Sequence, residues 1–181
     1  MKYTKNVFLK NNKKCLIRNA SGEDAQEVLN IFLLTHDQTD FLASYKDETS
    51  FDTAFERQFL TDRECADRQV YLCAIVDGHI VGTANVDSIG ENKVKHRAEL
   101  GVAIDKAFCG IGIGRALITA CIECAKEAGY SQLELEVVSE NSNAIALYKS
   151  MGFMEFGRNP RGFRSRYQGW QELILMRLEL E

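Results

Sequence analysis

Apolar residues in the first half of the chain fall into short runs that predict β-strands. Cys15–Asn19 is predicted as the first strand, and Val70–Val76 and His79–Val86 are two runs rich in β-branched residues. The dipeptide Asp77-Gly78 between these runs is typical of a type I′ turn, because both central residues of that turn adopt positive φ. The pattern therefore predicts an antiparallel hairpin in the middle of the chain.

Between the predicted strands, apolar residues recur every three or four positions, which is the spacing of a helix. Ser21, followed three residues later by Asp24, is typical of a helix start. The apolar positions of the helix that follows are Val28, Ile31, Phe32 and Leu34. A second helix is expected around Phe51–Leu60, inside a polar segment that carries many acidic residues.

The second half of the chain predicts alternating strands and helices. Strands are expected at 98–104, 133–138, 153–158 and 171–178, and helices at 113–128 and 143–151. A loop with four arginines is expected before the last strand: Arg158, Arg161, Arg164 and Arg166. Strands first, then strand–helix–strand–helix–strand, predict an α/β fold with a mixed central β-sheet flanked by helices.

Composition narrows the class of protein without changing this fold. The 181 residues are expected to form a single domain, 1–181, and 22 Lys+Arg against 26 Asp+Glu give a formal net charge of −4. A nucleic-acid-binding domain usually carries a basic field, so no nucleic-acid partner is expected. No run approaches the roughly 20 apolar residues of a membrane span, and the polar start Met1–Asn6 lacks the core of a signal peptide. The expectation is a cytoplasmic protein with no membrane partner.

Six cysteines raise the question of disulfides or a metal site. Without a secretion signal the thiols are expected to be free. Cys121 and Cys124 form a C-x-x-C about three turns into a predicted helix, and no His follows at zinc-ligand spacing. Core packing of small thiols is therefore expected, and no metal site is predicted.

A cluster of glycines, Gly110, Gly112 and Gly114, opens the helix predicted from 113. The run lacks the Gly-Lys-Ser/Thr ending of a Walker loop, and Arg115 stands where the Rossmann fingerprint needs its third glycine. Glycine lets backbone approach a ligand closely, and the first amides of a helix are unpaired donors at the positive end of its dipole. The cluster fits either a pyrophosphate-binding loop or a turn that only packs a helix on a sheet.

Two segments together narrow this choice. The run Val102–Gly114, followed by Asn141–Phe153 with its Asn-x-x-Ala-x-x-Leu-Tyr-x-x-x-Gly-Phe pattern, resembles the GNAT superfamily of acetyl-CoA-dependent N-acetyltransferases. The match is close over 97–157, which the resemblance identifies as the acetyl-CoA-binding core. Cys109 departs from the family pattern, which usually has Arg or Gln there; its backbone N–H is still available to the loop.

The resemblance implies roles for specific residues. The backbone of Val102, Ala103 and Ile104 would pair with the pantetheine arm of acetyl-CoA like an extra strand. A pyrophosphate loop would comprise Cys109, Gly110, Ile111, Gly112, Ile113, Gly114 and Arg115. Asn141 would hydrogen-bond the pantetheine or acceptor end, Asn143 would cap the following helix, and Lys149 would reach the 3′-phosphate. No metal takes part.

Two side chains are candidates for the chemistry. An alkyl amine with a pKa of about 10 must lose a proton before it attacks a thioester, so a base is needed. The resemblance assigns that role to Glu99, on the strand before the glycine loop; otherwise Glu99 is a surface glutamate. Tyr148 holds the family's position for the acid that protonates the departing thiolate, and its alternative is core packing. A backbone amide near Val102 or Ala103 would hold the oxyanion.

The function that follows is transfer of acetyl from acetyl-CoA to a primary amine of a small molecule or peptide, by direct attack. The alternatives are a catalytically inactive acyl-CoA-binding sensor and a nucleotide-binding protein using the same helix start. The acidic residues of 36–69 would attract an amine, whereas the four arginines would dock a carboxylate or phosphate. Both charge runs are also typical of solvated surface. A homodimer is possible within this interpretation.

Overall fold

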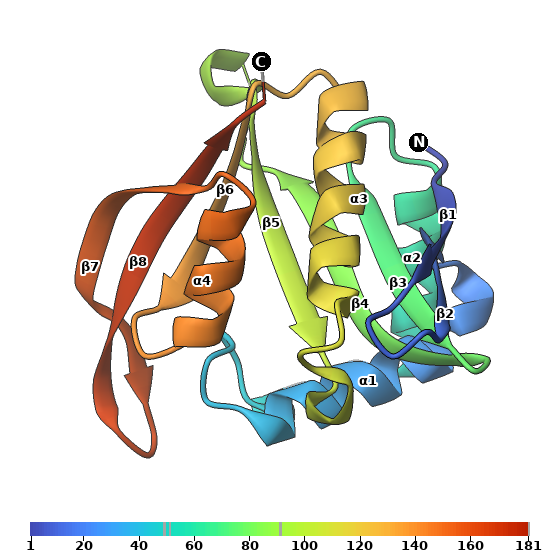
Figure 1. The fold of residues 1–181 in the computed structure, drawn as a ribbon, viewed down its shortest axis with the longest axis horizontal. Coiled ribbons are helices and arrows are strands. Elements are labelled where there is room, and N and C mark those ends of the chain that lie inside the picture. The colour runs from blue at the N-terminus through green and yellow to red at the C-terminus, as the bar shows by residue number, and fades with distance from the viewer. Residues whose placement is uncertain (49, 51, 91, 181) are drawn as a thin grey trace.

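The computed structural model describes residues 1–48, 50, 52–90 and 92–180, and its centre is one eight-stranded sheet (Figure 1). The strands lie in the order β1-β2-β3-β4-β5-β6-β8-β7. Their bounds are β1 Thr4–Phe8, β2 Lys14–Asn19, β3 Val70–Val76, β4 His79–Ser88, β5 Arg97–Ile104, β6 Gln132–Val138, β7 Met154–Ser165 and β8 Gly169–Glu179. Neighbours are antiparallel except β5 and β6, which run parallel. The mixed α/β sheet is therefore confirmed.

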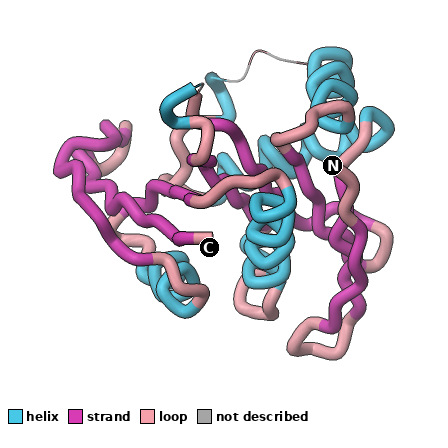
Figure 2. Tube along the Cα trace, turned by 90° about the horizontal axis from the view of Figure 1, so that it is seen from above, coloured by secondary structure: helices cyan, strands magenta, loops and turns pink. Residues whose placement is uncertain are grey.

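Four helices cover the two faces of the sheet. They are α1 Ala25–Gln38, α2 Thr53–Glu64, α3 Ile113–Glu127 and α4 Ser142–Ser150. Figure 1 shows α3 and α4 on one face and α1 and α2 on the other, and Figure 2 shows the same layers from above. Alternation along the strands supplies an apolar set to each face, so Leu72 and Val86 pack with α3 while Cys73 packs with α1 and α2.

Local signals in the sequence explain several boundaries. The Ser21 N–H donates to Asp24 Oδ2 at 2.8 Å, which closes the predicted helix start before α1. Asp77 and Gly78 have φ of 53° and 86°, as the hairpin turn requires. Gly129 follows α3 with φ of 75°. Phe51, the expected first residue of the second helix, lies outside the described residues; α2 begins at Thr53 on the Asp52 cap, whose side chain accepts from the Ala54 and Phe55 amides.

Two expectations about strands are wrong. The strand over residues 14–19 is the second, because Thr4–Phe8 pairs with it as an exposed edge strand that its mostly polar sequence does not indicate. The expected arginine loop does not exist either: β7 continues to Ser165, because its backbone keeps pairing with β8 through two register shifts. Arg158, Arg161 and Arg164 therefore lie on a strand, and Arg166 follows it.

The parallel pair β5–β6 is short, and this positions the site. Only Arg97–Glu99 pairs with β6, opposite Gln132–Glu134. Beyond Glu99, β5 stays paired with β4 through Ile104, while β6 stays paired with β8 through Val138. The sheet therefore splits between β5 and β6, and no strand of the described residues pairs with one side of the β5 backbone at Val102, Ala103 and Ile104.

Candidate functional site

The glycine loop ends beside this split. After β5, the chain forms a short 3₁₀ turn, Lys106–Phe108, and reaches α3 through Gly110 and Gly112, which have φ of 82° and 109°. No atom lies within 4 Å of a Cβ built on either glycine, so the space in front of both is open. A side chain would be strained at these φ values, which explains why glycine occupies both positions.

The first turn of α3 presents free amides to that space. The first hydrogen bond of the helix runs from the Ala116 N–H to the Gly112 carbonyl at 3.1 Å. The amides of Ile113, Gly114 and Arg115 precede it, and among the described residues no acceptor is found for them. Gly114 also lets α3 approach its neighbours, since a Cβ there would meet Leu147 at 3.0 Å. The loop thus has the donors and the open space that an anion requires.

Lys10, which the sequence does not single out, braces the loop from the β1–β2 turn. Its N–H donates to the Ile111 carbonyl at 3.0 Å, and its Nζ donates to the Gly110 carbonyl at 3.2 Å. These bonds orient two loop carbonyls away from the amide side. No local pattern could have indicated this contact, because it joins residues 100 positions apart.

Arg115 and Cys109 differ in what they offer. The Arg115 guanidinium donates to Ser150 Oγ at 2.7 Å, which ties the start of α3 to the end of α4. Cys109 is exposed at the loop, and its Sγ lies 3.7 Å from the Asp105 carbonyl. Desolvation and the nearby Asp105 raise the pKa of this thiol, so Cys109 stays protonated at neutral pH and is a poor nucleophile.

Helix α4 lies on the same face as α3 and carries three of the expected residues. Asn141 Oδ1 accepts from the Ala144 N–H at 3.3 Å and is the cap of α4. The capping role expected of Asn143 is therefore wrong: Asn143 is exposed within the first turn, because the helix begins at Ser142. Lys149 is exposed in the last turn.

Tyr148 sits on the inner side of α4. Its ring packs edge-on against Phe153 with centroids 5.8 Å apart. Its hydroxyl has no hydrogen-bond partner in the described part of the chain, yet it is not sealed from solvent, since the only enclosed and unbonded side-chain polar atom there is Arg68 Nε. Desolvation raises the pKa of Tyr148 to about 12. The phenol therefore stays protonated and is free to donate.

Glu99 lies on the opposite face of the sheet, where the split begins. Cross-strand neighbours share a face, so Glu99 stands between Asp87 of β4 and Glu134 of β6. Asp87 is paired with Arg63, and Glu134 accepts two bonds from Arg97 at 2.6 and 2.7 Å. Glu99 has no such partner among the described residues. Desolvation, and then the charges of Glu136, Asp87 and Glu134, raise its pKa, which suits a proton acceptor that works near neutrality.

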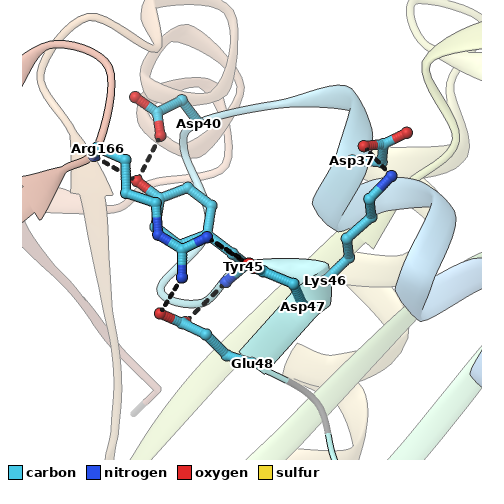
Figure 3. Close-up of polar contacts among 7 residues, drawn as sticks. All are labelled: Asp37, Asp40, Tyr45, Lys46, Asp47, Glu48 and Arg166. Carbon is cyan, nitrogen blue, oxygen red and sulfur yellow. Dashed lines mark hydrogen bonds and ion pairs between the residues drawn. The ribbon is translucent and has the colours of Figure 1, made fainter.

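A pocket of about 380 Å³ lies on the Glu99 side of the sheet, where the segment after α1 meets the β7–β8 turn. Its lining is His36, Asp37, Gln38, Thr39, Asp40, Tyr45, Lys46, Asp47, Arg166 and Tyr167. Figure 3 shows its polar contacts: Arg166 donates to both oxygens of Asp47 at 2.7 Å and to Glu48 at 3.0 Å, over the Tyr45 ring. Arg166 is therefore already neutralised.

Asp40 accepts hydrogen bonds from three residues around this pocket. Asp40 Oδ2 accepts from Ser165 Oγ at 2.5 Å, and Oδ1 accepts from the Tyr45 hydroxyl at 3.2 Å. The Gln171 amide, 3% exposed, also donates to the Asp40 carbonyl at 3.1 Å. The segment after α1 is thus fastened to β7 and β8 by buried or half-buried polar atoms.

Three cysteines of the core have no role in this site. Cys121, Cys124 and Cys73 are buried and unpaired, and burial raises the pKa of each thiol. In the described part of the chain, no three His, Cys, Asp or Glu side chains gather as metal ligands would, and no helix is both long and apolar enough to cross a membrane.

Comparison with known proteins gives one family. The model of the acetyltransferase (GNAT) family matches residues 31–153. N-alpha-acetyltransferase RimI of Mycobacterium tuberculosis is 32% identical over 94 residues, 52% of this chain and 58% of that protein. L-amino acid N-acetyltransferase AaaT of Escherichia coli is 32% identical over 83 residues, 45% of this chain and 51% of that protein. The match thus spans about half the length of these two relatives.

A solved structure extends the likeness to nearly the whole fold. An acetyltransferase of the GNAT family from Streptococcus pneumoniae superposes with a TM-score of 0.87 and 28% sequence identity. The superposition covers 91% of this chain and 99% of that one.

Proposed function

Because the chain belongs to the GNAT family of acetyltransferases, we propose that it transfers an acetyl group from acetyl-CoA to a primary amine of a small molecule or a peptide. The observation that carries this proposal is the juxtaposition of unbonded α3 amides, open space at Gly110 and Gly112, and the split beside Val102. A diphosphate needs the first two, and an extended amide-bearing arm needs the third.

In this proposal acetyl-CoA is the donor substrate, and the residues present fit it. The amides of 113–115 receive the pyrophosphate, and the free side of β5 at 102–104 pairs with the pantetheine arm. The side chain of Asn141 lies at the start of α4, near the thioester end of the bound acetyl-CoA. The exposed side chain of Lys149 contacts the 3′-phosphate. The thiol of Cys109 does not reduce the fit, because the loop binds through backbone groups.

Two side chains, on opposite faces of the sheet beside the split, then act in proton transfer: one accepts a proton and the other donates one. Glu99 accepts a proton from the acceptor ammonium, directly or through water, and the neutral nitrogen attacks the thioester carbonyl. A backbone amide near Val102 or Ala103 stabilises the oxyanion. As the oxyanion collapses, the C–S bond breaks and the Tyr148 phenol gives a proton to the departing thiolate. The nitrogen, now bonded to the acetyl carbon, releases its excess proton to water, which leaves the neutral amide. The raised pKa values of Glu99 and Tyr148 support these directions.

The acceptor carries a primary amine, and an α-amine is the first class to test. The names of the two relatives describe an N-alpha-acetyltransferase and an L-amino acid N-acetyltransferase. The pocket at Asp40 and Tyr45 lies on the Glu99 side, where an acceptor would approach without crossing acetyl-CoA.

The proposal is tested by release of free thiol from acetyl-CoA in the presence of L-amino acids, peptides and alkyl amines. We expect turnover by the wild-type protein, and a kcat at least tenfold lower for Tyr148→Phe, with the Kd for acetyl-CoA changed less than twofold. Tyr3→Phe is the matched control, because the Tyr3 hydroxyl bonds Glu123 on the outer side of α3.

Other outcomes separate the alternatives. Thermal stabilisation by acetyl-CoA without turnover of any amine would identify an acyl-CoA-binding module. Stabilisation by ATP or NAD but not by acetyl-CoA would overturn the donor assignment. Full activity of Tyr148→Phe would remove Tyr148 from the mechanism while leaving the transfer itself standing.

A further inference from the structure

Glu56 is a buried carboxylate with no partner in the described structure. It lies on the inner side of α2 and is 6% exposed, yet no hydrogen bond or ion pair reaches its side chain. The other buried acid, Glu134, is 9% exposed and is bound by Arg97. Burying a carboxylate without a partner costs stability, so Glu56 is an exception that the fold itself does not explain.

The carboxylate of Glu56 still touches solvent. Arg68 Nε is the one fully enclosed side-chain polar atom without a partner in the described residues, so the unbonded oxygens of Glu56 are not sealed. The group therefore opens onto space that a small solute can reach. Desolvation raises its pKa, as expected for a narrow, poorly hydrated position.

Glu56 faces the same side of the sheet as Glu99. Its charge acts on Tyr71 of β3, whose hydroxyl bonds Thr83 of β4. Figure 1 shows α2 behind this part of the sheet. Tyr71 is opposite Asn85, and Asn85 is opposite Gly101, so the row leads across two strands to β5 beside Glu99.

Helix α2 covers the β3 end of this row, where the Phe59 ring packs edge-on against Tyr71 with centroids 5.6 Å apart. Tyr71, Asn85 and Gly101 are all half-buried. With strands about 4.8 Å apart, the backbones of β3 and β5 lie about 10 Å apart across β4. Glu56 acts on Tyr71 at the β3 end of this row, and Glu99 lies beside its β5 end.

Arginines that could neutralise Glu56 are engaged elsewhere. Arg63, about two turns after Glu56 on α2, is bonded to Asp87, and Arg97 is bonded to Glu134. Arg166 is held by Asp47 and Glu48. Gln171 points to Asp40, on the Glu99 side of the sheet. Its neighbour Trp170 therefore points to the opposite face, and Arg164, which pairs with Trp170, lies on that face too. This side of the sheet offers an approaching acceptor unpaired negative charge.

We propose that Glu56 binds a second cationic group of the acceptor, so that the preferred acceptors are amines carrying another positive charge, such as α,ω-diamines or basic amino acids. The inference rests on the proposed function for the role of Glu99. One ammonium is held by Glu56 while the other nitrogen lies at Glu99.

Calorimetric titration tests this inference without turnover. Cadaverine (1,5-diaminopentane) is compared with n-pentylamine at pH 7.5, where both are fully protonated. We expect the wild-type protein to bind cadaverine at least tenfold more tightly than n-pentylamine, and Glu56→Gln to remove that preference. Glu64→Gln, which removes an exposed acid from the same helix, keeps it.

Stability distinguishes a binding role from a structural one. Glu56→Gln removes an unpaired buried charge, so its Tm at pH 7.5 should equal or exceed that of the wild type. Glu56→Asp retains the charge on a shorter side chain, and should keep a preference for diamines but move its maximum to a longer chain such as 1,6-diaminohexane.

Several results would overturn the inference. Equal affinities of the wild type for the two amines, no detectable cadaverine binding, or a preserved preference in Glu56→Gln would each do so. A large fall in the Tm of Glu56→Gln would assign Glu56 to the fold. Failure of the proposed function appears separately, as absence of thiol release and of stabilisation by acetyl-CoA, and leaves the titration readable.

Discussion

At the scale of single residues, charge placement decides how the candidate site would work. Glu99 stands opposite two acids that are neutralised by arginines, while Glu136 of β6 has no such partner among the described residues. The pKa of Glu99 is raised first by desolvation and then by Glu136. A base with a raised pKa is protonated at low pH, so activity should fall as the pH drops through that raised value.

Replacing Glu136 with Gln should shift this acidic limb. With one negative neighbour removed, Glu99 ionises more easily, so the limb of the kcat/KM profile moves to lower pH; Glu99→Gln should abolish the limb and lower the rate at least tenfold. The measurement is thiol release from pH 5 to pH 9 with one amine. Glu127→Gln on α3 is the control. An unmoved limb in Glu136→Gln would point to a base other than Glu99.

The sequence predicts such residues only in part. Glu99, Tyr148 and the glycines stand in recognisable order along the chain, and the structure brings Tyr148 and the glycine loop to one face of the sheet with Glu99 on the other. Lys10 and Glu56 carry no local signal. What sets Lys10 apart is a contact 100 positions away, and what sets Glu56 apart is a buried carboxylate without a hydrogen-bond or ion-pair partner among the described residues. Burial and pairing are properties of the assembled fold.

At the scale of elements, the turn before α3 is the most constrained backbone of the candidate site. Gly112 has φ of 109° and faces open space, whereas Gly129, at the other end of α3, has φ of 75° and also faces open space. The two glycines thus pose the same conformational demand at the two ends of one helix, but only Gly112 borders the free amides.

Because Gly112 and Gly129 make the same conformational demand, their alanine variants form a matched pair. Gly112→Ala and Gly129→Ala should each destabilise the fold by about 1 kcal/mol, because alanine tolerates positive φ poorly. Only Gly112→Ala should weaken acetyl-CoA binding, by at least tenfold in a titration, since its methyl group enters the anion space. Equal affinities in the two variants would contradict the assignment of this loop to the donor.

Element boundaries show where the sequence pattern succeeds and where it does not. Helices with clear start and stop residues, such as α3 with its glycines, match their predicted spans closely. Strand β7 exceeds its prediction because pairing with β8 compensates for Pro160 and Gly162 in its middle. Strand β1 is not predicted, because an exposed edge strand does not need the alternation of apolar and polar residues by which a strand is recognised.

At the scale of the whole molecule, the side of the sheet that we propose for the acceptor is closed by contacts between distant parts of the chain. Asp40, after α1, accepts from Ser165 and is reached by Gln171, more than 120 positions later. The arrangement links the helix layer to the outer strands on the side of Glu99. Loosening this link should affect the acceptor and leave the donor site intact.

Replacing Asp40 with Ala tests this separation. Loss of a half-buried acceptor that serves several donors should cost about 1–3 kcal/mol and should raise the acceptor KM severalfold, while the KM for acetyl-CoA stays within twofold. Asp62→Ala removes only an exposed hydrogen bond from Gln58, away from this pocket, and should be near neutral. Denaturant unfolding and steady-state kinetics on both variants provide the measurement. Equal changes in both KM values would show that the link supports the whole fold.

The three residue pairs between β5 and β6 also determine how the two parts of the sheet are connected. Strands β1 to β5 form one continuous panel and β6, β8 and β7 form another, and these panels are joined along their shared seam by Arg97–Glu99 alone. Below that seam, helices and side chains hold the panels in place. In the proposed complex, a strand-like ligand in the gap would contact both panels, and we expect it to make the sheet more rigid.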